Sequence, residues 1–177
     1  MNQEIPDVTE QPVVCLYAPI SGKVLPLGQV PDPVFAAGMV GDGAAIEPEG
    51  DLVLAPVDGE IAALFPTGHA IALRTPGGFE VLVHIGVDTV KSVGLFQALV
   101  AKGAHVRRGE PLIKIDLEGL RRQAPSMLSP VVVTNLPRGA RLRITGGPKV
   151  KAGRDPLFEV YMSGEYCGKS YRGTESR

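Results

Sequence analysis

The residues of this 177-residue chain best placed for chemistry are two histidines, His69 and His84. They lie on either side of Pro76-Gly77, in two short apolar runs that favour a β-hairpin. If Pro76 and Gly77 alone form the loop, His69 falls directly opposite His84, and their Cβ atoms lie about 5 Å apart. The sequence therefore predicts a pair of imidazoles on one face of a hairpin.

The same register assigns the neighbouring side chains to the two faces of the hairpin, because side chains alternate along a strand. Four residues are expected on the face of the histidines: Ile71, Leu73, Glu80 and Leu82. Five are expected on the opposite face, towards the core: Ala70, Ala72, Val81, Val83 and Ile85.

Paired imidazoles can perform phosphoryl transfer. A neutral imidazole has a free nitrogen lone pair, titrates near neutrality and can carry a phosphoryl group. A second imidazole can donate a hydrogen bond to the phosphoryl oxygens and stabilise their charge during an in-line transfer. Thr67, two residues before His69, is placed to hold that ring in one tautomer.

Two other functions compete with this interpretation. A zinc hydrolase would typically need three protein ligands, and only Glu80 or Asp88 is available beside the two histidines. Asp88 is equally suited to capping a turn at the edge of the site. A non-catalytic interaction module is the second alternative, since folds can persist without their chemistry. We expect no metal and no cofactor.

Composition favours one all-β domain. Hydrophobic residues make up 44% of the chain, and 22 glycines and 16 prolines separate short apolar runs. A formal net charge of −1 gives no reason to expect a nucleic-acid partner. Residues 1–12 are polar, without the apolar segment of a signal peptide, so we expect a disordered lead-in, no membrane insertion and a cytoplasmic location. The domain is predicted over residues 13–160, with a flexible tail over 161–177.

An internal repeat organises the predicted strands. Ala18-Pro19-Ile20-Ser21-Gly22 recurs as Ala55-Pro56-Val57-Asp58-Gly59, and Ser129-Pro130-Val131-Val132 echoes its first half. The repeat predicts two similar β-motifs packed against each other. Helical spacing is confined to residues 116–123, where Asp116 is the expected N-cap.

These motifs together resemble the glucose-type IIA component of the bacterial phosphoenolpyruvate-dependent sugar phosphotransferase system. The resemblance runs from Val13 to Asn135, and its most specific part is Val83-His84-Ile85-Gly86-Val87-Asp88-Thr89-Val90. It implies a β-sandwich of barrel-sandwich hybrid type with at most short helices. The family's partners would be the phosphocarrier protein HPr, a IIB domain of a sugar permease and, in some members, regulated transporters or enzymes.

The resemblance also implies roles for individual residues. His84 would accept the phosphoryl group on Nε2 from HPr and pass it to a IIB cysteine. His69 would stabilise the phosphoryl group, and Thr67 would orient His69. Five residues would form the surface on which the partner proteins dock: Phe35, Phe65, Leu82, Asp88 and Val90.

Overall fold

The computed structural model describes residues 11–162 of the chain, and it confirms an all-β fold with only short helices. Most of the predicted lead-in and tail, residues 1–10 and 163–177, lie outside the described residues. The last strand runs to Met162, two residues beyond the boundary expected at 160. Within residues 11–162, no helix is long and apolar enough to cross a membrane.

The strands form one eight-stranded sheet and two three-stranded sheets. The large sheet has the order β13-β2-β3-β11-β7-β6-β5-β9. Its strands, in chain order, are β2 Gly22–Pro26, β3 Asp42–Pro48, β5 Gly59–Leu64, β6 Ala70–Arg74, β7 Glu80–His84, β9 His105–Val106, β11 Ser129–Val133 and β13 Lys149–Val150.

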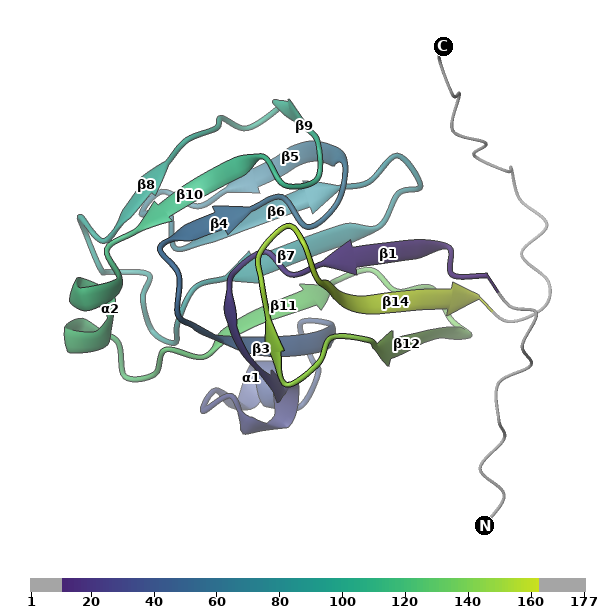
Figure 1. Ribbon diagram of the computed structural model, residues 1–177, viewed down its shortest axis with the longest axis horizontal. Coiled ribbons are helices and arrows are strands. Elements are labelled where there is room, and N and C mark those ends of the chain that lie inside the picture. The colour runs from purple at the N-terminus through teal and green to yellow at the C-terminus, as the bar shows by residue number, and fades with distance from the viewer. Residues whose placement is uncertain (1–10, 163–177) are drawn as a thin grey trace.

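The small sheets lie at the two ends of the molecule (Figure 1). The first has the order β4-β10-β8, with β4 Leu52–Leu54, β8 Phe96–Ala98 and β10 Pro111–Ile115. The second has the order β1-β14-β12, with β1 Val14–Tyr17, β12 Ala140–Ile144 and β14 Pro156–Met162. The strand pairs are antiparallel throughout the described sheets. Because β1 pairs with β14, the first and last strands of the described chain lie side by side in one sheet.

The two copies of the predicted repeat are joined by a reciprocal pair of backbone hydrogen bonds. The amide of Tyr17 donates to the carbonyl of Pro56, and the amide of Leu54 donates reciprocally to Pro19. The two repeat glycines also share a role. A Cβ added at Gly22 would lie 1.9 Å from the carbonyl oxygen of Glu47, and one at Gly59 would lie 2.5 Å from that of Arg74. The glycines are needed because a neighbouring strand approaches too closely for a side chain.

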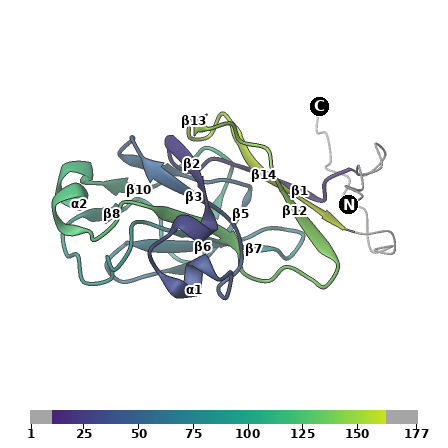
Figure 2. The same cartoon turned by 90° about the horizontal axis from the view of Figure 1, so that it is seen from below.

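Three short helical segments complete the fold of residues 11–162. The predicted helix is α2, Leu117–Gln123, and the Asp116 side chain accepts from the Gly119 amide as its N-cap. The 3₁₀ helix η1, Leu27–Gln29, and helix α1, Pro33–Ala36, were not predicted. Figure 2 shows α1 on the outside of the large sheet.

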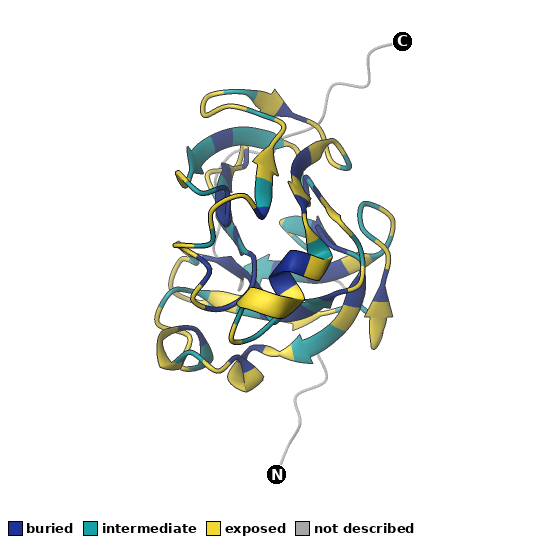
Figure 3. Ribbon diagram, turned by 90° about the vertical axis from the view of Figure 1, so that its left-hand side faces the viewer, coloured by how far each residue is buried: buried dark blue, intermediate teal, exposed yellow. Residues whose placement is uncertain are grey.

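Two clusters of buried apolar side chains hold these layers together. The larger cluster lies between the sheets and includes Phe158, Leu112 and Ile71, all fully buried. The smaller cluster lies beneath α1, where Phe35 packs with Val132 of β11 and Val87. Figure 3 shows the resulting alternation of buried and exposed segments on the strands and on α1. Because the small cluster borders the end of β7, it supports the residues around His84.

The predicted register of the histidine hairpin is wrong by one residue. Ala70, not His69, pairs with His84. The loop has three residues, since the amide of Thr75 donates to Phe79 and the amide of Gly78 donates to Thr75. Gly78 adopts a φ of +88°, as expected for a three-residue hairpin loop with a residue in the left-handed region.

This shift exchanges several residues between the two faces of the hairpin, because side chains alternate. Ile71 and Leu73, which we expected beside the histidines, are fully buried opposite Val83 and Val81. Ala70 and Ala72, which we expected on the opposite face, pair with His84 and Leu82 instead, although Ala70 is buried as expected. Leu82 and Glu80 keep their predicted face.

Candidate functional site

The two imidazoles lie together even though their backbones are not directly opposite. The ring centroids of His69 and His84 are 5.1 Å apart, and the rings meet edge to face at 74°. His69 lies just before β6, and its carbonyl accepts from the amide of Ile85. Gly68, with a φ of +77°, turns the chain immediately before His69, so the strict alternation of a strand does not apply there. The two imidazoles therefore meet diagonally, at the start of β6 and the end of β7.

The backbone fixes which nitrogen of His84 is free. Nδ1 of His84 lies 2.8 Å from the carbonyl oxygen of Gly86. A carbonyl can only accept a hydrogen bond, so Nδ1 carries the proton in the neutral ring. Nε2 is then unprotonated and keeps its lone pair, which makes it the nucleophilic atom of the site.

His69 has a different hydrogen-bond partner. Its Nδ1 lies 2.5 Å from Oγ1 of Thr67, on the same loop between β5 and β6. A hydroxyl can donate to an unprotonated Nδ1, which leaves the proton on Nε2. In that tautomer, His69 presents an N–H donor beside a histidine that presents a lone pair.

Two phenylalanines pack against the imidazole pair. The ring of Phe35 lies 5.1 Å from that of His84, and the ring of Phe65 lies 5.5 Å from that of His69, both tilted by 59°. Such tilted contacts are favourable for aromatic rings. Each imidazole therefore has one phenylalanine ring and the other imidazole as ring neighbours.

Burial favours the neutral form of both imidazoles. Burial lowers the pKa of His84, whereas its hydrogen bond to Gly86 and the charges of Asp32 and Asp88 act in the opposite direction. Burial, and then the neighbouring His84, lowers the pKa of His69. Because both pKa values are lowered from the ordinary histidine value of 6.5, the neutral form of each ring is favoured at pH 7.

The residues expected to form a docking surface differ in exposure. Phe65 and Val90 are 41% and 56% exposed, Asp88 is exposed and Leu82 is half-buried. Phe35 is only 8% exposed. It packs against the ring of His84, so little of its side chain is open to a partner in this structure.

Several residues at the site escaped the sequence reasoning. Asp32 caps α1 by accepting from the Val34 amide, and its charge acts on His84. The Asp32-Pro33 pair is a helix-start signal that could have revealed α1. Val34, Met39 and Val93 add exposed apolar side chains on the segments that border the site. Isolated exposed apolar residues carry no such signal.

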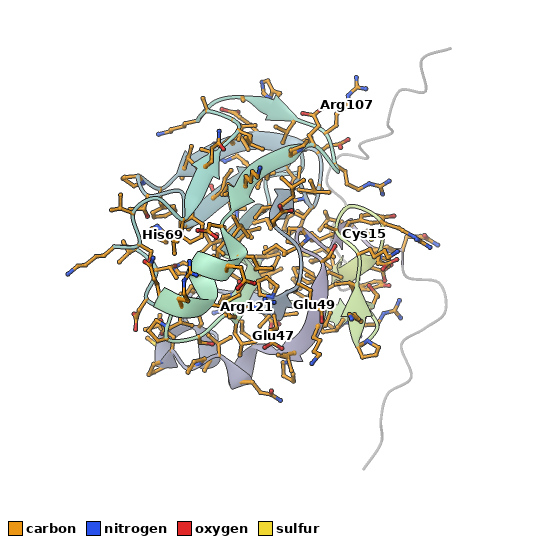
Figure 4. All side chains as sticks on the ribbon, turned by 60° about the vertical axis from the view of Figure 1, so that its left-hand side comes forward. Cys15, Glu47, Glu49, His69, Arg107 and Arg121 are labelled. Atoms are coloured by element: carbon orange, nitrogen blue, oxygen red, sulfur yellow. The ribbon has the colours of Figure 1, made fainter. Side chains whose placement is uncertain are left out.

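Other reactive groups lie elsewhere. Cys15, in β1, is the one cysteine among residues 11–162, and Figure 4 shows it on the far side of the molecule from His69. Burial and then the charge of Glu159 raise the pKa of its thiol. Within the same described residues, no group of three histidine, cysteine or acidic side chains is placed to hold a metal. The zinc interpretation therefore finds no third ligand there.

The sequence family described as phosphoenolpyruvate-dependent sugar phosphotransferase system, EIIA 1, matches residues 14–138. The chain belongs to this EIIA family. The glucose-specific EIIA component of Halalkalibacterium halodurans is 43% identical over 150 residues, which cover 84% of this chain and 87% of that protein. The glucose permease IIA of Mycoplasma capricolum superimposes with a TM-score of 0.77 at 36% identity, covering 83% and 94% of the two chains.

A longer relative contains the same unit within a larger protein. The N-acetylglucosamine-specific EIICBA component of Klebsiella pneumoniae is 44% identical over 149 residues, which are 84% of this chain and 23% of that protein. EIIA components are phosphotransferase components that carry a phosphohistidine intermediate. This EIIA chain is accordingly a phosphocarrier in sugar uptake, and neither the zinc hydrolase nor the non-catalytic module is supported.

Proposed function

We propose that His84 is the residue that carries the phosphoryl group, and that Nε2 is the atom to which it is attached. The observation that supports this most directly is the hydrogen bond from Nδ1 of His84 to the carbonyl of Gly86, which leaves the Nε2 lone pair free. In the transfer, a P–N bond forms at Nε2 while the P–N bond of the donor phosphohistidine breaks. The donor would be HPr.

His69 would stabilise the phosphoryl group without carrying it. Its Nε2–H can donate to a phosphoryl oxygen in the tautomer that Thr67 favours. On onward transfer, the bond to His84 breaks as a bond forms to the thiolate of a IIB cysteine. The neutral Nδ1–H form of His84 is restored as the leaving group.

A surface around the imidazoles would receive both partners. Phe65, Val90 and Leu82 supply apolar area, and Asp88 adds a negative charge at its edge. A small apolar centre with charges at the rim suits a transient complex, because the rim charges steer association without requiring a large buried area. HPr and IIB domains would meet the chain in the cytoplasm.

Phosphorylation of histidine variants tests the proposal. We expect phosphoenolpyruvate, enzyme I and HPr to add one acid-labile, base-stable phosphoryl group to the wild-type chain, measured by intact mass. His84→Ala should abolish the mass gain. His105→Ala is the matched control, because His105 is an exposed histidine on β9, and it should be labelled normally. Labelling of His84→Ala would refute the assignment.

A further inference from the structure

The chain leaves its strand immediately after His84. Val83 of β7 still pairs with Val131 of β11, but Gly86 adopts a φ of +68° and Val87 forms an isolated bridge to Ser126. A backbone that departs from its sheet must find other partners for its buried amides and carbonyls. The peptide unit joining Ile85 to Gly86 lies at this departure.

Two buried hydroxyls bind both polar groups of that peptide unit. The amide of Gly86 donates to Oγ of Ser129 at 3.0 Å, and the same hydroxyl donates to the carbonyl of Met127 at 3.0 Å. The carbonyl of Ile85 accepts from Oγ1 of Thr89 at 2.5 Å. Both hydroxyl residues are 0% exposed, so water cannot replace either partner.

This peptide unit lies between the His84 ring and the carbonyl that holds it. The Gly86 carbonyl belongs to the next peptide unit, whose Val87 amide donates to the carbonyl of Ser126. Because the two units meet at the Cα of Gly86, a rotation of the Ile85–Gly86 peptide would shift this carbonyl relative to Nδ1 of His84 and loosen the ring. Space around the turn is also limited, since a Cβ on Gly86 would lie 2.8 Å from Cγ2 of Thr89. The hydroxyls and the close packing together favour one orientation of the carbonyl.

We infer that Ser129 and Thr89 are positioning residues for phosphoryl transfer, which act by holding the Ile85–Gly86 peptide so that His84 keeps its proton on Nδ1. The inference rests on the proposed role of His84. The hydrogen bonds of Ser129 and Thr89 go to the backbone and not to the imidazole. Their effect on the ring is therefore transmitted by the Gly86 carbonyl. Partners of this kind, one contact removed from a reacting group, typically contribute about tenfold to a hundredfold to activity.

Four variants separate positioning from simple stability. Thr89→Val removes the hydroxyl with little change in shape, whereas Thr89→Ser keeps it. Ser129→Ala removes the second hydroxyl. Thr75→Val is the matched control, because Thr75 is a buried threonine whose Oγ1 accepts from the Phe79 amide at the other end of the hairpin.

The measurements are the ¹⁵N spectrum of the His84 ring and the rate of phosphorylation by HPr. We expect Thr89→Val and Ser129→Ala to mix the two ring tautomers and to lower kcat about tenfold with little change in KM. Thr89→Ser should restore both, and Thr75→Val should lose stability alone.

The inference is overturned if Thr89→Val and Ser129→Ala lose stability like the control but keep the Nδ1–H tautomer and the wild-type rate. Failure of the proposed function looks different, since the wild-type chain would then carry no phosphoryl group on His84. In that case the ring spectra still decide whether the hydroxyls set the tautomer.

Discussion

At the scale of single residues, two chemically identical side chains differ because their partners differ. His84 bonds to a backbone carbonyl, which can only accept, whereas His69 bonds to a threonine hydroxyl, which can also donate. One ring therefore presents a lone pair and the other an N–H at a separation of 5.1 Å between centroids. The roles proposed for them, His84 as carrier and His69 as hydrogen-bond donor, rest on these two contacts.

Replacement of His69 should separate acceptance of the phosphoryl group from its onward transfer. His69→Ala removes a preorganised donor, and such losses typically cost about 10²–10³ in rate. We expect the variant to be phosphorylated on His84 but to pass the group to a IIB cysteine very slowly. His69→Gln keeps a neutral donor and should be intermediate. Rapid-quench measurement of onward transfer checks this, and a normal rate for His69→Ala would show that the second imidazole is a bystander.

The lowered histidine pKa values also predict how stability depends on pH. Burial holds the pKa of His84 and His69 below their ordinary value of 6.5, so the unfolded chain binds more protons just below that pH. The free energy of unfolding should therefore fall as the pH drops below 6.5 and level off below the folded-state values. Urea unfolding across this range measures the slope. The double variant His69→Gln, His84→Gln should lack this component, and an unchanged slope would contradict it.

At the scale of elements, the hairpin shows how far the sequence could be interpreted. Its two strands, the proximity of His69 to His84 and the Thr67 contact follow from spacing and from turn residues. The register does not, because Pro76-Gly77-Gly78 is compatible with loops of two or three residues. The left-handed φ of Gly78 decides between them, and nothing in the apolar pattern distinguishes Ile71 from Ala70 as a core residue. The same limit applies to α1, which is four residues long and too short for a helical period.

Ser129 and Thr89 illustrate a second limit. A serine at the start of the buried run Ser129–Val133 must find a hydrogen-bond partner, which is a signal that the sequence contains. The identity of that partner, the Gly86 amide in the turn after β7 and 43 residues away in sequence, depends on the tertiary structure. Long-range side-chain contacts of this kind become visible only when β7 and β11 are paired.

Two glycine substitutions compare the turn after β7 with the hairpin loop before it. Gly78→Ala and Gly86→Ala both place a Cβ on a residue with left-handed φ, which costs about 1–2 kcal/mol. Gly78 has open space around it, whereas the new Cβ of Gly86 would meet Thr89 and Ser126. We expect Gly86→Ala to be the less stable variant by thermal unfolding and the slower one in phosphoryl transfer. Equal effects on both would show that the packing around Gly86 is not limiting.

At the scale of the whole molecule, the exposed apolar side chains near the imidazoles matter for association. Phe65 and Val90 border the site, whereas Ile144, also exposed, lies on β12 in a three-stranded sheet. Phe65→Glu and Val90→Glu should each raise the KM for HPr about tenfold with little effect on thermal stability, because 41% and 56% of these residues are already exposed. Ile144→Glu is the control and should leave KM unchanged. Equal effects from all three variants would rule out a localised docking surface.

We propose that the Gly86 carbonyl, by holding Nδ1 of His84, directs the phosphoryl group to Nε2. The most direct measurement is the ³¹P–¹⁵N correlation spectrum of the phosphorylated, ¹⁵N-labelled chain, which identifies the nitrogen bonded to phosphorus. We predict a single phosphoramidate on Nε2 of His84, with the Nδ1 proton retained in its hydrogen bond to Gly86. A phosphoramidate on Nδ1 of His84, or on either nitrogen of His69, would contradict this account of the site.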